Sequence, residues 1–144
     1  MARCPVVNWL MVAGVALVCC SGAQAGWFTN DRQDAFRAFE EGDYESALAG
    51  FSDDYRRGVV QYRSGQYEQA ARSFGRATRR AVKQDATYNL GNARFQLGDY
   101  EGAVTAYETV LDAEPDHDDA RHNLSLAKSR LGVLQEEQQQ EEQQ

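Results

Sequence analysis

The sequence predicts an all-α fold in which helical hairpins stack into a solenoid. The main observation is a period of 33 residues, and five pairs of positions share it: Gly58 and Gly91, Gly65 and Gly98, Tyr67 and Tyr100, Ala70 and Ala103, Phe74 and Tyr107. A second observation is that Asn89-Leu90-Gly91 returns as Asn123-Leu124-Ser125, 34 positions later. Such periods are typical of repeat proteins, in which each unit buries its apolar face against its neighbours. We therefore predict about two full repeats, one abbreviated repeat and a C-terminal capping helix.

The clearest copy of the repeat runs from Asp85 to Pro115. Its small residues Gly91 and Ala103 stand where two helices would have to approach closely, with larger side chains around them. Gly98-Asp99 interrupts the periodic run and supplies a turn followed by an acidic helix start. Pro115 has no backbone N–H and ends the second helix.

The same pattern along the chain predicts seven helices, with glycines at 42, 65 and 98 separating the two helices of each pair. The predicted helices are Asp31 to Glu41, Tyr44 to Phe51, Asp53 to Ser64, Tyr67 to Lys83, Asp85 to Leu97, Tyr100 to Ala113 and Asp118 to Leu131. Arg57 stands where the third repeat has Leu90, so we expect one weaker core position in the second repeat.

Both ends of the chain differ from the repeats. Residues 1–25 contain Arg3, an apolar run and an Ala23-Gln24-Ala25 site, which predicts a signal peptide cleaved after Ala25. An uncleaved membrane anchor and a lipid anchor on Cys19 or Cys20 are the alternatives, and all three place the folded part outside the cytoplasm. The repeat domain then spans 26–131. Residues 132–144 are rich in Gln and Glu, and we predict a disordered tail, with a docking segment as the alternative.

Charge and composition exclude several functions. The chain has 15 basic and 22 acidic residues, a net charge of −7, which makes nucleic acid an unfavourable partner. One local basic run, from Arg72 to Lys83, is followed one repeat later by an acidic run, from Glu108 to Asp119. We expect these runs to compensate each other across the stacked helices. A docking patch for an acidic partner or for anionic membrane headgroups is the alternative.

Residues that carry chemistry are few. Every cysteine lies in the first 20 residues, so the chain from Gly26 can form neither a disulfide nor a thiolate metal site. His117 and His122 lie among aspartates, where a metal site is conceivable, but we interpret them as surface residues at a helix start. No nucleophile is placed beside a base, and no glycine loop could cradle a phosphate. We predict no enzyme activity, no metal and no cofactor.

The repeat resembles the tetratricopeptide repeat (TPR). The residues that carry the resemblance are Leu90-Gly91, Phe95, Gly98, Tyr100, Ala103, Tyr107 and Pro115, and it extends over residues 31–131. The order GWF…AFRAFEEGDYESAL, the NLGNA…GDYEGAV repeat and the Gln-rich tail are more narrowly similar to the repeat proteins of the bacterial aerotolerance (Bat) operon. That resemblance implies a role in a cell-envelope complex, with membrane-anchored partners that carry von Willebrand type A domains.

The TPR resemblance also implies a concave groove lined by the first helix of each pair. The candidate groove residues are Tyr55, Arg56, Tyr62, Arg63, Tyr88, Asn89, Asn92, Phe95, Gln96 and His122, with Phe36, Phe39 and Val59 beside them. Asparagines spaced by one helical turn could bond an extended peptide backbone, while aromatic rings form pockets for its side chains. TPR domains that clamp a terminal carboxylate need Lys where Tyr55 and Tyr88 stand, so that ligand is disfavoured. We expect Asn92 to be exposed, so that removing its amide would leave stability nearly unchanged.

These features predict a non-catalytic adaptor in the periplasm, peripherally associated with the membrane in one version of the hypothesis. Its groove would hold a segment of a protein partner. The alternative is a structural scaffold that self-associates through convex or edge surfaces.

Overall fold

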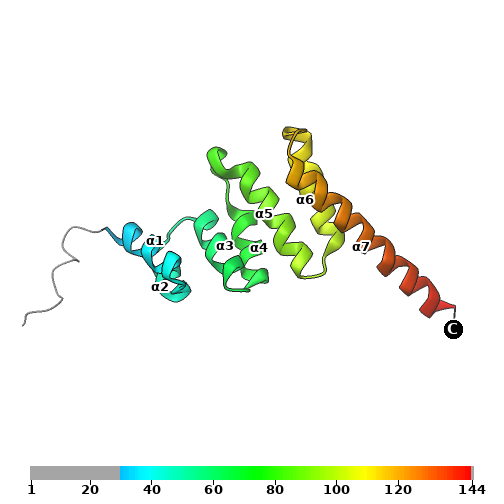
Figure 1. Cartoon of the computed structure of the whole chain (residues 1–144), viewed down its shortest axis with the longest axis horizontal. Coiled ribbons are helices and arrows are strands. Elements are labelled where there is room, and N and C mark those ends of the chain that lie inside the picture. The colour runs from blue at the N-terminus through cyan, green and yellow to red at the C-terminus, as the bar shows by residue number, and fades with distance from the viewer. Residues whose placement is uncertain (1–29, 144) are drawn as a thin grey trace, which may run out of the picture.

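The computed structural model describes residues 30–143, which form seven α-helices and one short 3-10 helix. The elements are α1 (Asp31–Glu41), α2 (Tyr44–Gly50), α3 (Asp54–Arg63), α4 (Tyr67–Arg76), η1 (Arg80–Val82), α5 (Lys83–Gln96), α6 (Tyr100–Ala113) and α7 (Asp118–Glu142). The part of the chain that the structure describes contains no strand. Successive helical hairpins stack along the long axis of the molecule (Figure 1). The predicted all-α hairpin solenoid is confirmed, whereas the predicted signal peptide lies outside the described residues.

Turn chemistry explains where each hairpin folds back. Gly42, Gly65 and Gly98 have φ angles of 80°, 76° and 77°, in the left-handed region that favours glycine, and each follows the first helix of a pair. A polar N-cap residue then precedes the next helix. Asp43 and Asp99 accept the backbone N–H of Ser46 and Gly102, which satisfies a donor that the helix itself cannot. The predicted positions of the hairpin turns are therefore confirmed.

A glycine facing an aromatic ring sets the distance between the two helices of a full repeat. A Cβ atom built at Gly91 would lie 2.6 Å from the ring of Tyr107, and one at Gly58 would lie 2.7 Å from the ring of Phe74. The two glycines and the two rings are each 33 residues apart, so both repeats use the same contact. Ala103, predicted at the same close approach, is fully buried. The helices can pack this closely because these positions carry little or no side chain.

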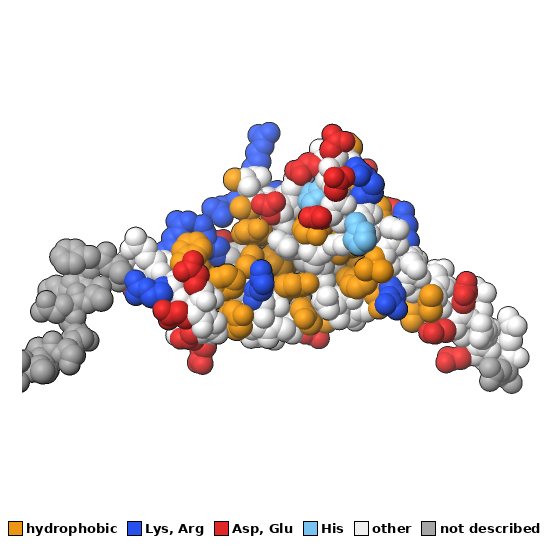
Figure 2. Space-filling view, viewed as in Figure 1, with side chains coloured by type: hydrophobic (Ala, Val, Ile, Leu, Met, Phe, Trp, Pro, Cys, Tyr) orange, Lys and Arg blue, Asp and Glu red, His pale blue; other side chains and the backbone are white. Residues whose placement is uncertain are grey.

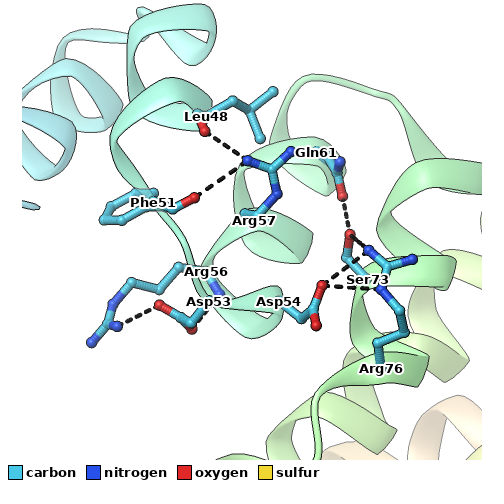
Figure 3. Close-up of polar contacts among 9 residues, drawn as sticks. All are labelled: Leu48, Phe51, Asp53, Asp54, Arg56, Arg57, Gln61, Ser73 and Arg76. Carbon is cyan, nitrogen blue, oxygen red and sulfur yellow. Dashed lines mark hydrogen bonds and ion pairs between the residues drawn. The ribbon is translucent and has the colours of Figure 1, made fainter.

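The junction between the first two repeats uses a charged side chain in place of an apolar one. The guanidinium of Arg57 donates to the backbone carbonyl of Leu48 at 2.8 Å and to that of Phe51 at 3.3 Å (Figure 3). These carbonyls end α2, where helical hydrogen bonds run out. From the sequence we expected Arg57 only to be a weaker core position. The structure shows that its side chain ties the abbreviated first repeat to α3.

Helix α4 ends earlier than predicted. We expected it to reach Lys83, but it stops at Arg76, and α5 already begins at Lys83. Gly75 is a weak helix former near this end. Beyond it, Arg76 and Arg79 lie 2.9 Å and 3.7 Å from carboxylate oxygens of Asp54 and Asp53, at the start of α3. The ion pair of Arg79 thus connects the segment after α4 to the start of α3.

Helix α7 is longer than predicted. We expected the capping helix to end at Leu131 and residues 132–144 to be disordered, whereas the helix continues to Glu142. Its last turns project away from the other helices (Figure 1), and the side chains from Val133 onward are exposed. Gln and Glu are good helix formers, so this segment can continue a helix that is already nucleated without burying anything.

We expect Gly91→Ala to lower the free energy of unfolding by at least about 1–3 kcal/mol, because the added methyl group overlaps the buried ring of Tyr107. The matched control is Gly75→Ala, since a Cβ at this helical glycine meets nothing within 4 Å. That control should be neutral or stabilise the protein by about 0.5–1 kcal/mol. Urea unfolding of the two variants measures the difference. Equal stability would show that the glycine contact does not set the helix spacing.

Candidate peptide-binding groove

The inner face of the solenoid is formed by the first helix of each full repeat and by the capping helix. Helices α3, α5 and α7 lie side by side, with α4 and α6 packed behind them (Figure 1). Figure 2 shows hydrophobic side chains gathered in the middle of this face, over α3, α5 and α7. The face on which the sequence predicted a groove therefore carries a hydrophobic surface.

The first cavity on this face has a volume of about 260 Å³ and lies over the C-terminal half of α5. It is lined by Tyr62, Asn92, Phe95, Gln96, Tyr107, Asn123 and Leu126. These side chains are aromatic, aliphatic or amide-bearing, and none of them carries a charge. The cavity therefore suits an uncharged group that is partly apolar and can exchange hydrogen bonds with amides.

A second cavity of about 280 Å³ adjoins the first between α3 and α5. It is lined by Tyr55, Val59, Tyr62, Arg63, Phe74 and Asn89. Tyr62 lines both cavities, so a single aromatic ring stands between them. Burial raises the pKa of Tyr62, opposed by a hydrogen bond with Gln96, and burial also raises the pKa of Tyr55. Both phenols are therefore neutral hydrogen-bonding groups at physiological pH.

Seven of the ten predicted groove residues line these two cavities: Tyr55, Tyr62, Arg63, Asn89, Asn92, Phe95 and Gln96. The other three do not. Arg56 lies 2.6 Å from Asp53 and 5.4 Å from the ring of Phe36, at the junction with the first repeat. His122 is exposed on α7 and lines neither cavity.

Tyr88, the third residue outside the cavities, supports the groove from behind. Its ring centroid lies 6.0 Å from that of Tyr107 and 4.9 Å from that of His117. Its hydroxyl accepts a hydrogen bond of 3.0 Å from the side chain of Asn123. Tyr88 therefore holds α7 against α5. Spacing alone could not reveal this role, because it depends on rings from three segments.

Asn92 is the centre of a polar network that joins α5, α6 and α7. Its Oδ1 atom accepts hydrogen bonds from the hydroxyl of Tyr107 at 2.8 Å and from Nδ2 of Asn123 at 3.0 Å. Tyr107 is only 1% exposed, and burial raises its pKa far above the ordinary value, so its hydroxyl stays protonated and donates. Our expectation that Asn92 is a free surface amide is therefore wrong, because both lone pairs of its oxygen are already engaged.

Three residues that line the first cavity were not predicted as groove residues: Tyr107, Asn123 and Leu126. Asn123 and Leu126 follow Asn89 and Asn92 by 34 positions, so aligning α7 with α5 as a further repeat unit would have found them. Tyr107 was predicted only as a residue that fills the core. Its ring does so, while its hydroxyl reaches the groove.

Comparison with known proteins agrees with this arrangement. The tetratricopeptide repeat family matches residues 55–118 and, in an overlapping second match, residues 88–137. The chain belongs to the tetratricopeptide repeat family. A comparison with curated protein sequences gave no match.

A solved TPR structure is similar over most of the chain. It is the crystal structure of the Sgt2 TPR domain from Aspergillus fumigatus, with 25% sequence identity and a TM-score of 0.64. The similarity covers 74% of this chain and 80% of that chain. TPR domains bind protein partners. Between residues 30 and 143, no helix has the length and apolar character needed to cross a bilayer.

We expect Asn92→Ala to lower the free energy of unfolding by about 1–3 kcal/mol, because it leaves the buried hydroxyl of Tyr107 without its acceptor. His122→Ala is the control, since this exposed side chain on the neighbouring helix should contribute within about 0.5 kcal/mol. Chemical denaturation of both variants gives the values. If the Asn92 variant were as stable as the His122 variant, the network would not hold α7 in place.

Proposed function

We propose that this TPR protein is a non-catalytic adaptor that holds a segment of a protein partner between α3, α5 and α7. The observation that carries the proposal is the pair of adjoining cavities on the inner face, which share Tyr62. Together they offer aromatic walls for side chains. The amides of Gln96 and Asn89 line the first and the second cavity, respectively, and a side-chain amide has further donors and acceptors for a peptide backbone beyond the bond it makes to a neighbouring side chain.

The lining also indicates the chemistry of the bound segment. The first cavity has no charged side chain, and Arg63 is the only charged residue that lines the second. A buried carboxylate would lack a cationic partner in the first cavity, and burying an unpaired charge is costly. We propose that the bound segment is uncharged where it enters the first cavity and carries bulky apolar side chains.

The cellular setting is a further part of the proposal. The apolar leader with its Ala-x-Ala site supports export. The resemblance to the Bat repeat proteins supports a membrane-associated complex in the bacterial envelope. Membrane-anchored proteins with von Willebrand type A domains are then the partners to test first.

Leu126→Glu should weaken capture of the partner at least about tenfold, because it places a carboxylate at the wall of the uncharged first cavity. Val133→Glu is a closely matched control: the same kind of change on the same helix, with an exposed fraction of 47% against 42% for Leu126, but outside both cavities. Photocrosslinking from Gln96 in intact cells, quantified by mass spectrometry, measures capture. Equal capture by both variants would contradict binding in the groove.

The proposed cleavage of the signal peptide leads to a separate prediction. The mature protein should begin at Gly26, and intact-mass analysis of the chain recovered from the envelope should find this N-terminus. Replacing Ala23 and Ala25 by Leu should block cleavage and leave a longer chain, because signal peptidase sites need small residues there. A mass that includes the leader in the unaltered protein would favour the uncleaved anchor, and an added lipid mass would favour Cys19 or Cys20.

A further inference from the structure

One edge of the solenoid carries two patches of opposite charge that do not neutralise each other. The basic lobe comprises Arg72, Arg76, Arg79, Arg80 and Lys83, at the connection between α4 and α5. We predicted that it would pair with the acidic run one repeat later, and this is wrong. Arg76 and Arg79 pair with Asp54 and Asp53 of their own repeat. Within residues 30–143, Arg72, Arg80 and Lys83 are exposed and make no ion pair.

The acidic lobe lies at the next equivalent connection, between α6 and α7. It comprises Asp112, Glu114, Asp116, Asp118 and Asp119, all exposed. Asp118 pairs with Arg121 at 2.6 Å, whereas the other four make no ion pair among the described residues. This lobe therefore keeps most of its negative charge.

The two lobes lie next to each other on the same edge. The α4–α5 and α6–α7 connections both lie along the upper edge of Figure 1, because they are separated by one repeat. In Figure 2, basic side chains stand at the upper left of this edge and acidic side chains at its upper right. A rotation by 180° about an axis between the lobes would bring each lobe opposite the other lobe of a second copy. The edge is thus complementary to itself, which is the requirement for a two-fold interface.

We propose that a second copy of this chain docks on this edge, with the basic lobe of each copy against the acidic lobe of the other. An anionic membrane or nucleic acid is a poor occupant of this edge. Either would be attracted to the basic lobe but repelled by the acidic lobe next to it. The interaction does not use the groove, so it is compatible with partner binding. It gives a structural basis for the self-association that was the alternative function predicted from the sequence.

The dimer is weak and sensitive to salt. Exposed ion pairs contribute little each, and two connecting segments bury less surface than a stable dimer needs. The whole chain has a net charge of −7, so two copies repel each other at long range. Near 0.1 M salt the screening length is about 10 Å, which favours contact between lobes over repulsion between whole molecules. Near 1 M it falls to about 3 Å and the attraction is lost.

Sedimentation velocity of the purified chain over a range of concentrations tests this proposal. Near 0.1 M salt the chain should show a concentration-dependent shift toward dimer, which disappears near 1 M. Arg80→Glu with Lys83→Glu removes most of the net positive charge of the basic lobe, and Glu114→Lys with Asp116→Lys removes most of the net negative charge of the acidic lobe, so neither double variant should dimerise like the unaltered chain. An equimolar mixture of the two double variants should associate again, because the intact acidic lobe of the first variant meets the intact basic lobe of the second.

The control for the Arg80/Lys83 variant is Arg32→Glu with Arg130→Glu, which changes the net charge by the same amount at exposed residues outside the edge. It should dimerise like the unaltered chain, and far-ultraviolet circular dichroism verifies that every variant is folded. A monomer at every concentration near 0.1 M salt would overturn the proposal, as would double variants that dimerise on their own. Binding of the unaltered chain to anionic vesicles in place of dimer formation would also overturn it. None of these outcomes affects capture in the groove, which depends on other residues.

Discussion

The close contact between a glycine and an aromatic ring is the constraint on which the rest of this structure depends. Gly91 receives the ring of Tyr107, and Gly58 receives that of Phe74, at the same place in two consecutive repeats. Because this contact fixes how closely the two helices of a pair approach, it also fixes the rotation of each first helix about its axis. The two rings of this contact, Tyr107 and Phe74, themselves line the two cavities, beside side chains from the first helices.

The same contact also gives the groove its rigidity. Tyr107 is held by Gly91 on one side, and its hydroxyl reaches Asn92, which in turn accepts from Asn123 on α7. Three helices therefore meet at one amide oxygen, and the buried hydroxyl of Tyr107 depends on it as an acceptor, which makes its loss costly. A cavity whose walls are held in this way binds a segment without first having to be ordered, which favours affinity.

The repeat spacing was enough to predict most of the fold and much of the groove. Gly65, Gly98 and the capping aspartates mark helix ends through local backbone chemistry, so the hairpins could be predicted from the sequence. The end of α4 could not, because Gly75, a weak helix former, precedes it without the left-handed glycine that follows the first helix of each pair. Tyr88 and Asn92 have the spacing of groove residues, and only the rings and amides of neighbouring helices give them a supporting role. Helix ends marked by local turn and capping residues could therefore be predicted. The roles of residues that depend on contacts with neighbouring helices could not.

Helix α7 links the stability of the array to its binding. It supplies Asn123 and Leu126 to the first cavity, and it also covers the buried face of α6 through Ala127, which is fully buried. A terminal helix in a repeat array has a neighbour on one side only, so it opens at a lower cost in free energy than a helix inside the array. In the proposed binding mode a segment between α5 and α7 contacts both walls and is lost when α7 opens. Binding would therefore stabilise the closed array by mass action, which couples the position of the last helix to the partner.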